Sequence, residues 1–140
     1  MNNEMSNTPP ERQRLLRIAL RCNGIFSLVS GALLVILNRE IVHLLGLAEG
    51  NSLAPIGISL LVFAGLLFMG ARKSNLNVAY ARVVVLMDLA WVLGSYILVF
   101  LAPFSSPGKW IVAIVAEFVL AFAIAQWLGI RRIAKNGQYA

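Results

Sequence analysis

The sequence predicts an all-α, polytopic membrane protein in which four transmembrane helices form a bundle. Of the 140 residues, 59% are hydrophobic and only 13% are charged, with a mean hydropathy of +0.79. A soluble domain carries fewer apolar and more charged residues than this. The apolar residues gather in four runs, each long enough to cross about 30 Å of hydrocarbon as a helix. None of the runs alternates with the period of two that barrel strands show, so we expect helices.

The four predicted spans cover residues 20–37, 53–71, 79–102 and 110–130. They belong to one transmembrane domain, residues 15–132, between a polar segment that includes the start of the first helix, residues 1–14, and a polar tail, residues 133–140. A capping box is predicted at Thr8, Pro9, Pro10 and Glu11, so we expect the first helix to begin before the bilayer. Ser106 and Pro107 predict the start of the last helix after a tight turn.

The longest connection between spans, residues 38–52, predicts a short interfacial helix. Its apolar residues Ile41, Leu44, Leu45 and Ala48 recur at the spacing of one helix face. His43, the only histidine of the chain, lies on this segment. One imidazole is a weak metal-ligand set, so we expect a polar interfacial side chain and no metal site.

The positive charges predict the orientation in the membrane. Arg39 and Lys109 stand on one side of the predicted spans, and the other ten of the twelve Lys and Arg residues stand on the opposite side: Arg12, Arg14, Arg17, Arg21, Arg72, Lys73, Arg82, Arg131, Arg132 and Lys135. By the positive-inside rule, both termini and the middle loop face the cytoplasm. The net charge of +6 therefore reports topology, and we expect no nucleic-acid partner.

Several functional classes lack the residues that they need. Cys22 is the only cysteine, which excludes a disulfide scaffold and a cysteine-ligated metal cluster. The sequence has no nucleophile elbow, no H-E-x-x-H, no P-loop and no glycine-rich dinucleotide fingerprint. We therefore expect no enzymatic activity and no cofactor, with a quinone or a lipid as the one class of bound molecule that stays open.

Asp88 and Glu117 are the candidate functional residues, because an ionisable group costs at least about 2.5–3.5 kcal/mol at the centre of a membrane helix. Asp88, Trp91 and Ser95 share one helix face, which we expect to point into the bundle. Asp88 is either a buried carboxylate bonded to Asn23, Ser27 or Arg21 of the first span or to Arg82 of its own helix, or else a proton relay, the polar end of a ligand pocket, or a docking point for a partner.

Glu117 is expected in a helix seam beside Ala113, Ala116 and Ala121, as a protonated hydrogen-bond donor. Gln126 lies nine residues from Glu117, about 180° around the helix, and therefore belongs to another face. Small residues mark the expected packing seams between helices, or faces for another subunit: Gly24, Ser27, Gly31, Gly57, Ala64, Gly65, Gly94 and Ser95.

The chain resembles the small four-helix bacterial membrane proteins loosely called DoxX-like. The resemblance covers residues 15–132 at the level of topology and depends on an arginine-led first helix with four short segments: Ser30-Gly31-Ala32-Leu33-Leu34, Ile41-Val42-His43-Leu44-Leu45-Gly46-Leu47, Ile56-Gly57 and Ala71-Arg72-Lys73. It implies a multi-pass protein of the bacterial inner membrane, of a kind sometimes associated with quinone-linked redox complexes. It supplies no catalytic residues.

Three functional hypotheses follow from the sequence. The favoured one is an accessory or scaffold subunit that contacts a membrane-protein partner, or a second copy, through its small-residue faces. A small proton-coupled transporter using Asp88 and Glu117 is the second. The third is a bundle that binds a quinone or a lipid between its helices, with Trp91 and Tyr96 lining the pocket.

Overall fold

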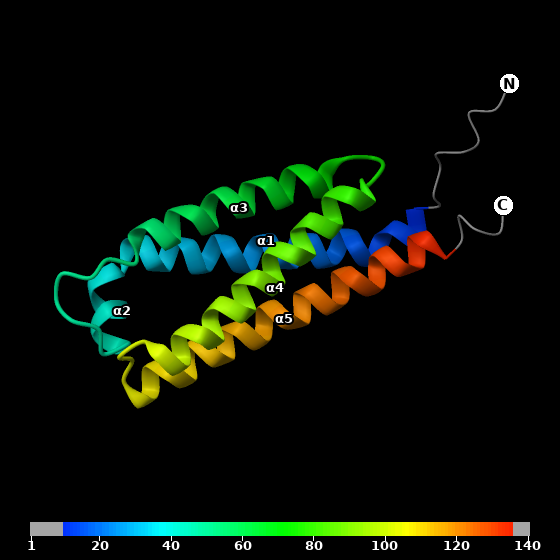
Figure 1. Ribbon diagram of the computed structural model, residues 1–140. Helices are drawn as coiled ribbons and strands as arrows, with labels where there is room; N and C mark the ends of the chain where they lie inside the picture. Colours follow the sequence, from blue (N-terminus) through cyan, green and yellow to red (C-terminus); the bar gives the residue numbers. More distant parts are fainter. Residues whose placement is uncertain (1–9, 136–140) are drawn as a thin grey trace, which may run out of the picture.

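The computed structural model describes residues 10–135, and these residues are helical apart from short connections. The helices are α1 (Pro10–Ile36), α2 (Asn38–Leu44), α3 (Ala54–Arg72), α4 (Val78–Leu101) and α5 (Ser106–Ala134), and no strand occurs in the described range (Figure 1). Four of them, all except α2, are long and apolar enough to cross a membrane. The predicted all-α class with four candidate spans is therefore confirmed, and the chain is a multi-pass membrane protein.

Residues at both ends of the chain lie outside this range. The predicted capping box includes Thr8 and Pro9, and the tails 1–9 and 136–140 are likewise outside the described residues. At the other end of the chain, α5 begins at Ser106 as predicted, because the Ser105 hydroxyl accepts a hydrogen bond from the Gly108 amide at 3.1 Å. This contact satisfies one of the free amides in the first turn of the helix.

The long helices pack in pairs. α1 packs along α3 and also against α5, and α4 packs along α5. Although α3 and α4 follow one another in the chain, they diverge from their connection, as Figure 1 shows. The start of α1, the α3–α4 connection and the end of α5 lie at one end of the molecule, which we call the basic end because the predicted cytoplasmic arginines and lysines stand there.

The hydrophobic core lies toward the basic end. It consists of the buried residues Leu16, Leu20, Leu67, Ala71, Ala81, Val84, Val85, Ala123 and Ile130. At this end α1 and α5 come into close contact, because a Cβ atom on Gly129 would lie 2.9 Å from the Leu16 Cα atom. Small residues permit this approach, which is how membrane helices gain packing contacts.

At the opposite end, α1 and α3 cross at Gly31 and Gly57. A Cβ atom on either glycine would lie 2.7 Å from the carbonyl oxygen of the other, so neither position has room for a side chain. The predicted seam is thus present at this pair. It is absent at Gly65, which is exposed and where an added Cβ atom would meet nothing within 4 Å.

The predicted short helix between the first two spans is present as α2, but its buried face matches the predicted one only at Leu45. Val42 and Leu45 are buried, whereas Leu44 is 53% exposed and Ala48 follows the end of the helix. The reason is tertiary: the Ser105 amide donates to the Leu45 carbonyl at 2.9 Å and the Ser105 hydroxyl faces the Leu44 carbonyl at 3.2 Å. These contacts hold α2 against the start of α5.

Arg17 of α1 holds the connection between α3 and α4. Its guanidinium donates to the carbonyl oxygens of Ala71, Lys73 and Ser74, which end α3 and begin the connection. The last carbonyls of a helix have no partner within the helix, so a side-chain donor stabilises them. Arg17 therefore fixes the point from which α3 and α4 diverge.

Candidate functional site

Asp88 lies at the centre of a buried polar network that joins three helices. Its side chain, on α4, is 2% exposed. One of its oxygens, Oδ2, accepts hydrogen bonds from Asn23 Nδ2 of α1 at 2.7 Å and from Gln126 Nε2 of α5 at 3.0 Å. Asn23 in turn accepts a hydrogen bond from the Ser27 hydroxyl at 3.3 Å. The cost of burying the carboxyl group is thus offset by two amide donors.

The partners of Asp88 only partly coincide with those expected from the sequence. Asn23 contacts it directly, and Ser27 reaches it through Asn23. Arg21 and Arg82 are both exposed and form no hydrogen bond with Asp88. No salt bridge therefore neutralises Asp88 within the described residues, and neutral amides take the place of the expected arginines.

Gln126 is the member of the network that the sequence reasoning missed. It is fully buried, and its Oε1 atom has no hydrogen-bond partner among the described residues. The sequence feature that could have revealed it is the angle of about 180° that separates Gln126 from Glu117 around α5. Because Glu117 faces outward, Gln126 must face inward.

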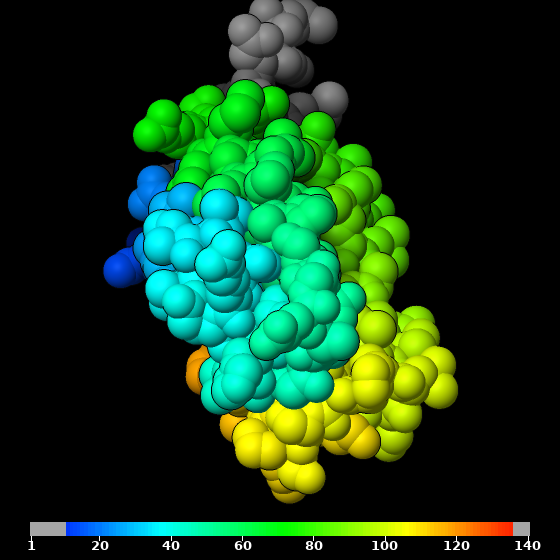
Figure 2. All heavy atoms as spheres, turned by 90° about the vertical axis from the view of Figure 1, so that its left-hand side faces the viewer, coloured from blue at the N-terminus to red at the C-terminus, as the bar shows by residue number. Residues whose placement is uncertain are grey.

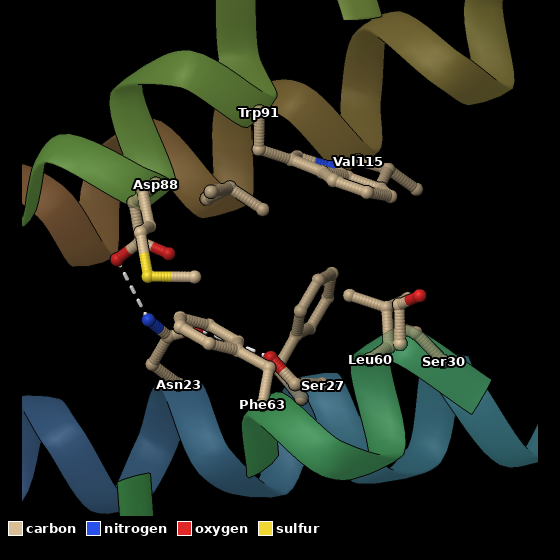
Figure 3. Close-up of a pocket in the computed structure, with 12 residues that line it drawn as sticks. Asn23, Ser27, Ser30, Leu60, Phe63, Asp88, Trp91 and Val115 are labelled. Atoms are coloured by element: carbon tan, nitrogen blue, oxygen red, sulfur yellow. Dashed lines mark hydrogen bonds between the residues drawn. The ribbon is translucent and has the colours of Figure 1, made fainter. Parts of the chain in front are cut away.

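The second oxygen of Asp88 faces a cavity. Figure 3 shows one carboxyl oxygen joined to Asn23 and the other directed into the space between Trp91 and Phe63. This space, which we call the Asp88 cavity, has a volume of about 150 Å³, and its walls come from all four long helices: Asn23, Phe26, Ser27 and Ser30 of α1, Ser59, Leu60 and Phe63 of α3, Met87, Asp88 and Trp91 of α4, and Val115 and Val119 of α5. The hydroxyl and carboxyl groups are thus placed among mainly apolar side chains.

A larger apolar cavity lies next to the Asp88 cavity, toward the end that carries α2. It has a volume of about 540 Å³ and lies between the start of α3 on one side and the later turns of α4 with the start of α5 on the other. Trp91 and Val115 line both cavities. Figure 2 looks onto this end, with α2 in cyan and the α4–α5 turn in yellow. We call these two neighbouring cavities together the α3–α4 groove.

The polar stripe on α4 faces inward, as the sequence predicts. Asp88 and Ser95 are buried, and the Trp91 ring lines the α3–α4 groove. The Ser95 hydroxyl lies 2.8 Å from the Trp91 carbonyl oxygen of its own helix, to which it donates. It is therefore already paired, which leaves the free oxygen of Asp88 as the strongest acceptor in the groove.

Gly94 lines the larger cavity on the same helix, and an added Cβ atom there would meet nothing within 4 Å. Gly94 therefore does not lie in the packing seam that the sequence predicts for it. Instead, the absence of its side chain leaves the groove open, because α3 has diverged from α4 at this level.

Glu117 does not belong to this site. It is exposed on the outer surface of α5, where it accepts a hydrogen bond from the Tyr96 hydroxyl of α4. The expected place in a seam is therefore wrong, because Ala116, the preceding residue, takes the buried position. Tyr96 was expected to line a pocket, and its hydroxyl is instead turned to Glu117 on the exposed side.

His43 lines a third, polar cavity of about 420 Å³ near α2, together with Arg39, Glu49 and neighbouring residues. His43 itself is exposed. Within residues 10–135, no three His, Cys, Asp or Glu side chains come together as a metal site.

Comparison with known proteins identifies no relative: no family model, no curated protein and no solved structure matches this chain. The geometry of the α3–α4 groove is consequently the basis on which a function is proposed.

Proposed function

We propose that this protein is a multi-pass protein of the bacterial inner membrane that binds an apolar small molecule of the quinone or lipid class in the α3–α4 groove. The observation that carries the proposal is the free oxygen of Asp88. It faces the Asp88 cavity of the mainly apolar α3–α4 groove, while the other oxygen is held by two amides.

The chemistry of the groove defines the ligand. Its larger part is almost entirely apolar and accommodates a hydrocarbon chain. The Asp88 cavity, of about 150 Å³, has room for a small end group only, and the polar side chains on its walls include Asp88, Asn23 and three serines. A phosphate at this point would lie beside a carboxyl group and be repelled at close range. The ligand is therefore a long apolar molecule that ends in a hydroxyl or a carbonyl.

A ligand hydroxyl would complete the hydrogen bonding of Asp88. The free oxygen is accessible within the cavity, so a hydroxyl donor from the ligand could reach it and pair with it. A carbonyl, as in an oxidised quinone, accepts instead and requires a protonated Asp88. The ionisation of Asp88 would then decide which form of a quinone binds.

The distribution of charge supports the orientation. Ten of the twelve basic residues stand at the basic end, so we place both termini and the α3–α4 connection in the cytoplasm. The polar end of the ligand then lies inside the bilayer and its chain extends toward the outer surface. The proposed ligand site and orientation do not depend on the resemblance to DoxX-like proteins, which stays a hypothesis.

The accessory-subunit hypothesis has an observation of its own. Glu117 and Tyr96 form an exposed hydrogen-bonded pair on a surface that would otherwise face lipid. Polar groups in a membrane are commonly covered by a neighbouring helix, so a partner subunit on this face is the second candidate function. The transporter hypothesis gains no support, since Asp88 faces inward and Glu117 outward.

Ligand retention tests the proposal, with Gly94→Leu as the blocking variant and Gly65→Leu as its matched control. Both glycines have open space beside them, but only Gly94 lines the groove. The protein is purified in mild detergent, extracted with organic solvent, and analysed by mass spectrometry. We expect wild type and Gly65→Leu to retain a near-stoichiometric apolar compound and Gly94→Leu to lose it at least about tenfold.

Asp88→Asn then identifies the polar group of the ligand. If the ligand donates a hydroxyl hydrogen bond to Asp88, the variant should retain less of it, because the asparagine amide presents a donor where the ligand needs an acceptor. A ligand that accepts through a carbonyl should be kept. Retention in Gly94→Leu, or wild type that carries bulk phospholipid alone, contradicts the proposal.

A further inference from the structure

A second apolar groove lies on the outside of the molecule, between α4 and α5 near the basic end. It has a volume of about 690 Å³ and is lined by Val85, Leu86 and Leu89 of α4 and by Ala123, Ile124 and Trp127 of α5, with Arg82 at its end. None of these residues lines the α3–α4 groove. We call this feature the α4–α5 groove.

Its walls suit a hydrocarbon chain. Leu86 is 65% exposed and Leu89 is 43% exposed, so apolar surface is left open along α4. From Arg82 to Leu89 the helix rises about 10 Å, which is a substantial part of one leaflet. An acyl chain lying there would cover this surface without disturbing the core.

The end of the groove carries a positive charge without a counter-charge. Arg82 is exposed, and no hydrogen bond or salt bridge to it occurs within residues 10–135. It stands four residues after the start of α4, about 6 Å along the helix. Trp127 lies at the same groove and is 47% exposed. An arginine and a tryptophan together are typical of the level of lipid headgroups.

We propose that the α4–α5 groove binds an anionic phospholipid, with its phosphate on Arg82 and one acyl chain along Leu86 and Leu89. The guanidinium group pairs with phosphate oxygens through two parallel hydrogen bonds. A second copy of the chain is a poorer occupant: two copies with the same orientation in the bilayer are related by an axis along the membrane normal, so the two Arg82 side chains would lie at the same depth beside the shared interface and repel one another. This site is separate from the ligand site proposed at Asp88 and depends only on the protein's lying in a bilayer.

Native mass spectrometry of the full chain in detergent tests the proposal. The protein is titrated with phosphatidylglycerol and with phosphatidylcholine that carry the same acyl chains. Wild type should bind phosphatidylglycerol more tightly than phosphatidylcholine. In Arg82→Gln the ratio of the two affinities should fall by about fivefold, which is the contribution of one arginine near an anionic lipid. Equal affinity of wild type for the two lipids would overturn the proposal.

Arg21→Gln is the matched control, because Arg21 is also exposed near the basic end but lies on α1, outside the groove. It should keep the preference for phosphatidylglycerol. An equal loss in Arg21→Gln and Arg82→Gln would mean diffuse charge attraction and no defined site, and a wild-type dimer that excludes lipid would assign the groove to a second copy. Either result refutes the proposal.

The same spectra separate this site from the one at Asp88. Arg82→Gln should retain the apolar ligand of the α3–α4 groove, and Gly94→Leu should retain the preference for phosphatidylglycerol. If wild type retains no apolar ligand but prefers phosphatidylglycerol, the proposal at Asp88 is wrong. If it retains the ligand but shows no such preference, the proposal at the α4–α5 groove is wrong. Equal unfolding temperatures of wild type and Arg82→Gln verify that this exposed substitution leaves the fold intact.

Discussion

The crossing of α1 and α3 offers the sharpest test of the packing, through the substitution Gly57→Ala. A Cβ atom at this position would lie 2.7 Å from the Gly31 carbonyl oxygen, 2.9 Å from the Leu34 Cβ atom and 2.9 Å from the Val35 Cγ2 atom. Ordinary contacts of a Cβ atom lie near 3.4–4 Å. Because the nearest atom belongs to the backbone, a side-chain rotation cannot relieve the clash, and the two helices must separate.

The magnitude follows from two opposing effects. Overpacking of this kind costs about 1–3 kcal/mol. Replacing glycine by alanine within a helix returns up to about 1 kcal/mol. Gly65→Ala is the matched control, since it lies on the same helix and its Cβ atom would meet nothing within 4 Å. The helix gain is common to both variants, so their difference isolates the clash at about 1–3 kcal/mol.

Thermal unfolding in detergent, followed by circular dichroism, measures this difference. At about 3 °C per kcal/mol for a chain of this size, Gly57→Ala should melt about 3–9 °C below Gly65→Ala. Gly31→Ala should behave like Gly57→Ala, because its Cβ atom would lie 2.7 Å from the Gly57 carbonyl oxygen. If Gly57→Ala and Gly65→Ala have the same unfolding temperature, the close approach of α1 and α3 is refuted.

Three further perturbations test other parts of the structure. Asn23→Ala should lower the free energy of unfolding by about 1–3 kcal/mol, because it removes one of the two amide donors to Asp88; a double-mutant cycle with Asp88→Asn that shows no coupling would contradict the network. Arg17→Met should speed protease cleavage at residues 73–77, because the carbonyls at the end of α3 lose their donor. The exposed control Arg14→Met should cleave like wild type, and equal cleavage of both variants would contradict the role of Arg17. In a Cys22→Ser background, Asn51→Cys should react with an impermeant maleimide added to whole cells, whereas Asn75→Cys should react only after lysis; the reverse pattern would invert the proposed orientation.

The sequence sufficed for features that depend on local chemistry. Hydrophobic run length located the four long helices, since a span needs about 20 apolar residues. Ser106 and Pro107, which are the first two residues of α5, located its start. The spacing of Asp88, Trp91 and Ser95 placed them on one inward face, because the helix period alone aligns them.

The tertiary structure decided which faces meet. Gln126 became a partner of Asp88, and Glu117 turned outward, only because α5 presents one side to both α1 and α4. In a uniformly apolar helix, hydrophobicity does not distinguish the face toward lipid from the face toward protein. The buried face of α2 was set by Ser105, some sixty residues away. The groove that ends at Asp88 exists because α3 follows α1 while α4 follows α5, and that choice of neighbours depends on packing between distant glycines and leucines that no single segment of sequence encodes.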